Sequence, residues 1–359
     1  MSLKTEPSHI AIVGAGAVGC LVGGRLAEAG LDVTLIDAWP EHIEAIQRHG
    51  LAFEEPGGIQ TIKVRALHIG QVQSLYRHPV DIAFICVKLY DTEWATALIA
   101  PYLSATGYVV TLQNGLIEEA IAARVGWART VGCIGSGLHV ALAAPGRLQR
   151  ARAPARSASP CFYIGEAHGR ITPRARHLAD MLQHVDTSVL TGNLWGLRWA
   201  KLVANCMTSA LCAVADMDLK ALFSDSESRR AMTQLASEAI VLGNALGYDV
   251  ENVFGLPADV WVAAARGEPA DLLRVGDVFR KQSEPLTHRA ISGTAQDIQK
   301  GRRTEVAYMN GYVAARAREA GMAAPCHAGL ANLIERIESG SARPDRANLQ
   351  RLSQTRGNT

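Results

Sequence analysis

The first part of the chain alternates short, β-branched apolar runs with stretches in which apolar residues recur every three or four positions. The apolar runs are typical of strands buried on both faces of a parallel sheet, and we expect them at residues 10–13, 32–37, 80–88 and 108–113. The helical periods between them predict helices at residues 17–29, 40–49 and 92–103. Strands alternating with helices indicate an α/β domain with a doubly wound, Rossmann-type sheet.

Further strand patterns follow at residues 51–65, 131–140, 147–150 and 161–165, with a helix expected at 173–183. From residue 194 the strand pattern disappears, and helical periods cover residues 194–214, 226–246, 257–265 and 291–338, the last with a break near residues 321–325. We therefore divide the chain into three parts. These are a dinucleotide-binding Rossmann-type domain at residues 1–191, an all-helical substrate and catalytic domain at 192–338, and a polar, frayed tail at 339–359.

The first expected strand runs directly into a glycine-rich turn. Gly14, Gly16 and Gly19 have the G-x-G-x-x-G spacing that joins a strand to a helix in dinucleotide-binding domains. The first glycine permits a tight turn, the second lets a pyrophosphate approach the backbone, and the third lets the helix lie close to the strand. The rest of the expected phosphate-binding turn consists of Ala15, Ala17 and Val18.

Three polar residues lie at or just after the ends of expected strands. Asp37 lies 23 residues after Gly14, where an acidic residue is expected to accept hydrogen bonds from the adenosine ribose. Lys88 is the last residue of the next expected strand, and Asn114 follows the strand after that. Because ligands gather at the carboxyl ends of the strands in open α/β sheets, we expect all three residues to contribute to cofactor binding.

Composition excludes several classes of protein. The 359 residues contain 36 basic and 34 acidic side chains, and this balance predicts neither a nucleic acid nor a membrane as partner. The seven cysteines form no C-x-x-C pair, and His139, His288 and His327 have no acidic neighbour at a metal or triad spacing, so we expect no metal site. Scattered single cysteines and the absence of an apolar leader favour a cytoplasmic protein.

The helical part carries a lysine in an apolar setting. Lys201 and Asn205 are four residues apart and share a helix face. A lysine partly removed from water would have a lowered pKa, which makes it a better acid near neutral pH. The alternative is a lysine whose apolar stem lies on the helix surface while its ammonium stays in water.

A second polar cluster lies near residue 300. Asp297, Gly301 and Glu305 recur every four residues, so we expect them on one face of a single helix, with the glycine allowing a close approach. The apolar residues next to Glu305 suggest a carboxylate turned inward, toward a partner such as Lys201.

Four blocks together resemble the ketopantoate reductases (2-dehydropantoate 2-reductases). They are residues 14–19, the Leu-Gln-Asn-Gly run at 112–115, the Trp-Ala-Lys-Leu-Val-Ala-Asn run at 199–205, and the segment from Gln296 to Gly311. The resemblance implies reduction of a small 2-oxo acid by a nicotinamide cofactor, as in pantothenate biosynthesis. It also implies Lys201 as general acid, Glu305 as the group that binds the substrate hydroxyl, and Asn114 and Asn205 as residues that orient substrate and nicotinamide.

The chain departs from the family pattern where the substrate is expected to bind. Gly293 replaces a serine that would help to hold the substrate carboxylate, and Ser292 or Thr294 could substitute for it. Ala307 and the pair Ser209-Ala210 stand where the family has an aspartate and an Asn-Pro pair. The identity of the 2-oxo acid is therefore left open.

The cofactor is a second departure, because Asp37 stands where the family, which commonly uses NADPH, has a basic residue. A carboxylate repels a 2′-phosphate, so we expect NAD(H), with NADP(H) left open by Lys88. Two other functions are also left open: a 3-hydroxy-acid or opine-type dehydrogenase, and a non-catalytic dinucleotide-binding sensor. Helical surfaces such as residues 211–222 suit either a core or a homodimer interface.

Overall fold

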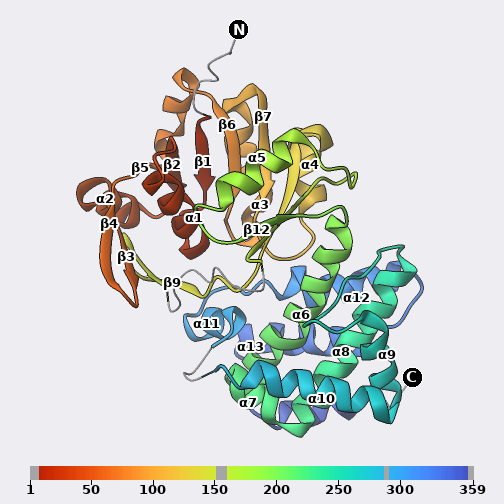
Figure 1. Ribbon diagram of the computed structural model, residues 1–359. Coiled ribbons are helices and arrows are strands. Elements are labelled where there is room, and N and C mark those ends of the chain that lie inside the picture. The colour runs from red at the N-terminus through yellow and green to blue at the C-terminus, as the bar shows by residue number, and fades with distance from the viewer. Residues whose placement is uncertain (1–7, 151–159, 287–290, 355–359) are drawn as a thin grey trace. The chain divides into compact units, whose positions relative to one another are not determined.

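The computed structural model describes residues 8–150, 160–286 and 291–354, and the chain divides into two compact units, Met1–Leu194 and Trp195–Thr359 (Figure 1). The division falls at the start of helix α6 (Leu194–Ala215). No helix in the described ranges is long and apolar enough to cross a membrane.

Eight strands of the N-terminal unit form one sheet in the order β12-β11-β8-β7-β6-β1-β2-β5. All neighbouring strands are parallel except β8 and β11. The central strand is entirely buried, and its Ile12 pairs with Leu35 of β2 and Phe84 of β6. The strands are β1 (Ile10–Val13), β2 (Val33–Asp37), β5 (Arg65–His68), β6 (Val80–Ile85), β7 (Leu103–Thr111), β8 (Thr130–Gly135), β11 (Phe162–Gly165) and β12 (Ser188–Leu190).

Helices connect these strands and pack on the sheet. Leu21 and Leu26 of the first helix belong to the same buried cluster as Ile12, Leu35 and Phe84, because that helix turns its apolar stripe toward the sheet. The fold class expected from the pattern is thereby confirmed. The helices of this unit are α1 (Ala17–Glu28), α2 (Pro40–His49), α3 (Thr92–Ile99), α4 (Glu118–Val125) and α5 (Pro173–Leu182). Short 3₁₀ helices are η1 (Ile69–Arg77), η2 (Leu89–Asp91), η3 (Ala100–Tyr102) and η4 (Trp127–Arg129).

A second, four-stranded sheet has the order β4-β3-β10-β9 and comprises β3 (Leu51–Glu55), β4 (Gly58–Ile62), β9 (Val140–Ala144) and β10 (Arg147–Arg150). The expectation of one strand at residues 131–140 is wrong, because β8 ends at Gly135 and β9 begins at Val140 in the other sheet. The backbone turns between them at Gly137 and His139, which have φ angles of +66° and +46°. Apolar pattern alone did not reveal this break.

The C-terminal unit is helical, and a single isolated bridge between Val253 and Leu256 is the strand-like pairing found in its described part. Its largest fully buried side chains are Trp199, Trp261, Arg198 and Phe279. The helices are α6, α7 (Leu219–Ser224), α8 (Ser226–Ala245), α9 (Ala258–Arg266), α10 (Pro269–Ser283), α11 (Gly293–Gln299), α12 (Asn310–Glu319), α13 (Pro325–Glu338) and α14 (Asn348–Gln354), with the 3₁₀ helix η5 (Val306–Tyr308) before α12.

The single helix expected around Gly301 does not form. Helix α11 stops at Gln299, and Gly301 has a φ of +61°, which is the left-handed conformation of a helix C-cap. The Arg302 amide donates to the Asp297 carbonyl at 2.8 Å and closes this cap. Asp297 and Glu305 therefore do not share a helix face. The glycine ends the helix rather than allowing close packing, since no atom lies within 4 Å of the position of its missing Cβ.

The polar tail expected from residue 339 is also partly wrong. Residues Asn348–Gln354 form α14, in which Leu349 and Leu352 are buried. The Asn348 side-chain amide donates to the carbonyl of Val214 at 2.9 Å. Two apolar side chains in a polar stretch are too few for a periodic signal, but they are enough to hold a short helix on a preformed core.

We predict that Gly301→Ala lowers the free energy of unfolding by about 1–2 kcal/mol, because an alanine is strained in the left-handed conformation. Gly276→Ala in α10 is the matched control: Gly276 lies inside a helix in open space, where alanine stabilises by about 0.5–1 kcal/mol. Urea unfolding of both variants measures the two effects. If both substitutions changed the free energy of unfolding by the same amount and in the same direction, Gly301 would not be the cap of α11.

Candidate active site

Backbone contacts fix the glycine turn after β1. Gly14 has a φ of +99°, and a Cβ added there would lie 2.7 Å from the backbone of Cys86 and Val87. A Cβ on Gly19 would lie 2.0 Å from the Gly14 carbonyl oxygen, so helix α1 approaches the turn more closely than any side chain permits. At Gly16, by contrast, the added Cβ would meet nothing within 4 Å. Packing therefore requires a glycine at positions 14 and 19, whereas Gly16 leaves its backbone accessible to a ligand.

The N-terminus of α1 is available to an anion. Gly16 is its N-cap and supplies no side chain to the first amides, and the first turn contains no acidic residue. Unpaired amides at the positive end of a helix bind phosphate groups. Open space at Gly16 together with an uncapped helix therefore fits the pyrophosphate of a dinucleotide.

Asp37 is the last residue of β2 and is half-buried. Its Oδ1 accepts a hydrogen bond from the backbone amide of Trp39 at 2.9 Å. The Gly14 amide donates to the Ile36 carbonyl at 2.8 Å, which ties the glycine turn to the end of the strand that carries this carboxylate. Asp37 thus directly follows the residue whose backbone contacts the turn, and its binding of the ribose stays a prediction.

Two loops carry Lys88 and Asn114. Strand β6 ends at Ile85, so Lys88 lies beyond the strand and is half-buried, whereas Asn114 is exposed. A residue overlooked in the sequence joins these loops: the side-chain amide of Gln113 donates to the Val87 carbonyl at 2.9 Å and to the Thr92 hydroxyl at 2.7 Å. The sequence offered one signal for Gln113, which is that it directly precedes the predicted site residue Asn114.

In the helical unit, α6 presents Lys201 and Asn205 one turn apart. Burial, and secondly the positive charge of Arg198, lower the pKa of Lys201 to about 8. The Asn205 Nδ2 atom is buried, and no hydrogen-bond partner is found for it in the described part of the chain. A buried donor without a partner is costly, so these two side chains have the character of a ligand site rather than of a solvated helix face.

The hydroxyl of Ser292 is already engaged. It donates to the carbonyl of Ser209 at 2.8 Å and accepts from the amide of Ala295 at 3.2 Å as the N-cap of α11. A hydroxyl has one proton to donate, so Ser292 cannot also donate to a substrate carboxylate without losing the first bond. Thr294 is half-buried, and Gly293 is exposed with no atom near its missing Cβ.

Glu305 immediately precedes η5 and is half-buried. It is not among the groups that set the pKa of Lys201, so the expected pairing of these two residues stays a prediction. Five residues further, Asn310 links three helices: its amide donates to the Cys206 carbonyl of α6 at 3.0 Å and lies 3.3 Å from Nδ1 of His327.

The histidines named from the sequence have different environments. His139 is exposed, His288 lies outside the described residues, and His327 is fully buried. Burial lowers the pKa of His327 to about 4, and its Nε2 donates to the Leu235 carbonyl at 2.9 Å. His327 is thus a neutral core residue.

A histidine cluster not expected from the sequence lies at the amino ends of β1, β2 and β6. Donor atoms of His9, Asp32 and His78 lie within 4.8 Å of one another. However, the two imidazoles are stacked at 4.2 Å, so their in-plane lone pairs do not converge, and Nε2 of His9 bonds to Thr34. His78 Nε2 bonds to Asp32 at 2.6 Å. These contacts make the cluster a hydrogen-bonded anchor for the strands.

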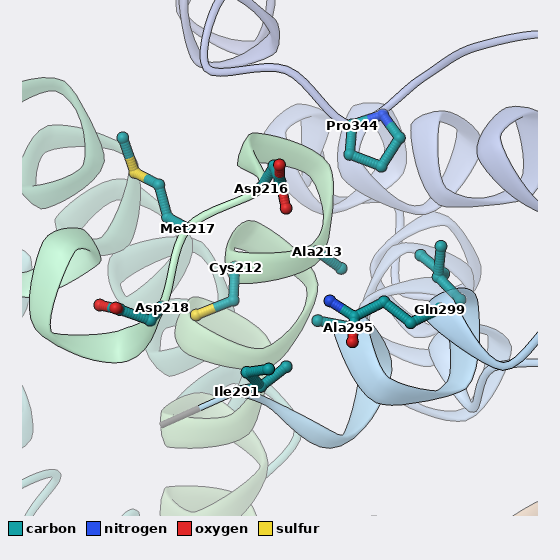
Figure 2. A pocket seen from close by; sticks show the side chains of 10 residues that line it. Cys212, Ala213, Asp216, Met217, Asp218, Ile291, Ala295, Gln299 and Pro344 are labelled. Atoms are coloured by element: carbon teal, nitrogen blue, oxygen red, sulfur yellow. The ribbon is translucent and has the colours of Figure 1, made fainter. Parts of the chain in front are cut away.

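A small pocket of about 30 Å³ opens at the C-terminal end of α6 (Figure 2). Figure 2 shows Cys212 and Asp218 on one side of it and Ala295 and Gln299 of α11 on the other. Cys212 lies 11 residues beyond Lys201, about 16 Å along the helix. The pocket therefore lies about three helical turns from Lys201, and Asn205 is closer to that lysine than the pocket is.

A Rossmann-type sheet with an open glycine turn, followed in the chain by a helical unit that carries a desolvated lysine, has the features of two-unit oxidoreductases with a dinucleotide-binding domain. The family model described as "Ketopantoate reductase PanE/ApbA" matches residues 10–156, and the model of its C-terminal part matches residues 193–338. The chain belongs to the ketopantoate reductase family.

Relatives and solved structures agree with this membership. The chain is 27% identical over 339 residues to the 2-dehydropantoate 2-reductase of Archaeoglobus fulgidus, which covers 92% of this chain and 98% of the relative. A ketopantoate reductase structure from Ralstonia eutropha is 26% identical, covers 92% of this chain and 99% of its own, and has a TM-score of 0.75. D-mandelate dehydrogenase with NADH and anilino(oxo)acetate shares the fold at 22% identity and a TM-score of 0.76, with the same coverage.

We predict that Gly16→Ala weakens dinucleotide binding at least tenfold and leaves the free energy of unfolding within about 1 kcal/mol of the original, because the added methyl meets only the ligand. Gly19→Ala is the contrasting variant and destabilises the fold itself. Calorimetric titration with NADH and NADPH and urea unfolding separate the two. Unchanged dinucleotide affinity in Gly16→Ala would refute the open position as a pyrophosphate site.

Proposed function

We propose that this oxidoreductase reduces the 2-oxo group of ketopantoate or a related small 2-oxo acid by hydride transfer from a nicotinamide cofactor, with Lys201 as the general acid. The observation that carries the proposal is the pairing, on one face of α6, of a lysine whose pKa is lowered to about 8 with a buried asparagine donor. The relatives named 2-dehydropantoate 2-reductase support the same reaction.

When bound, the reduced nicotinamide supplies the hydride. The ammonium of Lys201 hydrogen-bonds the carbonyl oxygen of the substrate and gives it a proton as negative charge develops there. Nδ2 of Asn205 donates to the substrate, and the Glu305 carboxylate accepts a hydrogen bond from its hydroxyl. Asn114 orients substrate and nicotinamide, and Thr294 is the remaining hydroxyl donor for the substrate carboxylate.

The N-terminal unit would hold the cofactor through its own backbone. The first amides of α1 bind the pyrophosphate, and residues 14–19 exclude side chains from that space. The carboxylate of Asp37 accepts from the ribose hydroxyls, and Lys88 contacts an adenosine phosphate.

The test is a panel of 2-oxo acids assayed with NADH and NADPH. Ketopantoate turnover confirms the proposal, whereas preferential turnover of an N-acylated or 3-oxo acid favours an opine-type or 3-hydroxy-acid dehydrogenase. Dinucleotide binding without turnover of any of these acids favours a sensor. A bulkier aromatic 2-oxo acid belongs in the panel because Gly293 is exposed and open, and because the D-mandelate dehydrogenase structure holds anilino(oxo)acetate.

Lys201→Ala should lower kcat by about 10²–10⁴ while leaving the Kd of the cofactor nearly intact, because a general acid acts in the transition state. The control is Lys220→Ala, which removes an exposed helical lysine of the same unit and should leave kcat unchanged. Steady-state kinetics and cofactor titration measure both effects. Full turnover by Lys201→Ala would remove the mechanism.

The pH profile tests the same role. Since burial lowers the pKa of Lys201 to about 8, the acid is protonated below pH 8 and loses its proton above it. The kcat/KM for reduction should therefore be level below pH 8 and fall above it, and the reverse reaction should show the opposite trend. Lys201→Ala should abolish both dependences.

Cofactor preference follows from Asp37. We predict a higher kcat/KM with NADH than with NADPH, and a shift of that ratio by about tenfold toward NADPH in Asp37→Ala, because the carboxylate repels the 2′-phosphate. Glu44→Ala, which removes an exposed carboxylate from α2, should not move the ratio. Equal or better use of NADPH, with a ratio that Asp37→Ala does not alter, would show that Asp37 does not select the cofactor.

A further inference from the structure

The carbonyl of Ala15, inside the glycine turn, accepts a hydrogen bond from a thiol. Cys20, on α1 and fully buried, donates its S–H to that carbonyl at 3.0 Å. Both residues are completely buried, so water cannot replace the bond. The thiol thereby fixes the orientation of the peptide between Ala15 and Gly16, whose other face is the open backbone expected to meet the pyrophosphate.

A buried histidine supports the thiol. Nε2 of His42, on α2, lies 3.5 Å from Sγ of Cys20. Nδ1 of the same imidazole accepts from the backbone amide of Gly146 at 2.9 Å. Because an amide only donates, Nδ1 carries no proton, and a neutral imidazole then carries its proton on Nε2. Burial lowers the pKa of His42 and favours the neutral ring, whose Nε2 proton is directed at the Cys20 sulfur and at the backbone of Ala15, to which His42 also hydrogen-bonds.

The same imidazole also contacts the segment after β2. Trp39 stacks on His42 with ring centroids 5.4 Å apart and planes inclined by 14°. The amide of Trp39 donates to Oδ1 of Asp37. The His42 ring therefore contacts Cys20, which bonds to the glycine turn, and also Trp39, whose amide bonds to Asp37.

We propose that Cys20 and His42 are positioning residues for the dinucleotide, which hold the Ala15 carbonyl and thereby aim the amides that bind the pyrophosphate. The inference rests on the proposed cofactor and assigns to it two residues outside the glycine motif. His42 reaches the Ala15 backbone both through the Cys20 thiol and by a hydrogen bond of its own, so the loss of either residue removes support from that carbonyl.

The test compares variants that keep and remove each donor. Cys20→Ala should raise the Kd of NADH about 3- to 10-fold at unchanged kcat with saturating cofactor, because it removes one hydrogen bond from the turn and none from the reacting groups. Cys20→Ser keeps an O–H donor and should bind within about twofold of the original. His42→Leu should resemble Cys20→Ala, and His42→Gln, whose amide can accept from Gly146 and donate to sulfur, should restore most of the affinity.

Cys133→Ala is the matched control, since it truncates a fully buried cysteine of the same unit, on strand β8. It should lower the free energy of unfolding as Cys20→Ala does without changing the Kd of NADH. Equal affinity loss in Cys133→Ala, or original affinity in both Cys20→Ala and His42→Leu, overturns the inference. Failure of the unmutated protein to bind NADH and NADPH would instead refute the proposed function.

Discussion

The close approach of helix α1 to the end of β1 is the constraint on which the N-terminal unit depends. At Gly19 the helix lies so near the Gly14 carbonyl that a single methyl group could not be added. That approach brings the first amides of α1 to the carboxyl end of the central strand, where they have no side-chain cap. Because the helix packs so closely, the groups left at this end of the sheet to bind an anion are the backbone amides of α1. The close packing therefore creates the anion-binding character of the turn.

In the helical unit, burial both fixes a helix in place and changes the acidity of a side chain on it. Helix α6 packs through Trp199, which is fully buried and donates its indole N–H to the Ala239 carbonyl at 2.8 Å. Fixing the helix in this way holds the next turns of α6 in apolar surroundings, and the charged form of Lys201 becomes less favourable there. Desolvation that costs stability also makes the ammonium a stronger acid. A buried asparagine donor on the following turn adds a second group that a ligand could satisfy.

Membership of the ketopantoate reductase family establishes the class of enzyme, and the local contacts bear on its substrate. Ser292 caps α11 and bonds to α6, so its proton is used within the protein. The neighbouring Gly293 is exposed and open, where a family serine would stand. A 2-oxo acid bound beside this position would therefore meet fewer hydroxyl donors and more room than the family pattern provides.

The sequence by itself determined the Rossmann-type sheet, the helical second half and the residues that carry the family resemblance. Apolar periodicity, glycine spacing and the spacing of polar residues are local signals. They can be read directly from the sequence around Gly14, Asp37, Lys201 and Asn205. It wrongly continued the helix through residues 300–305, because the spacing of Asp297, Gly301 and Glu305 suits a helix equally well whether or not the glycine adopts a left-handed backbone. It also missed α14, whose stability comes from a core built elsewhere in the chain.

Only the tertiary structure decided that Ser292 has no proton to spare and that Cys20 and His42 support the glycine turn. Those roles rest on contacts between residues up to 104 positions apart, and no local pattern records such distances.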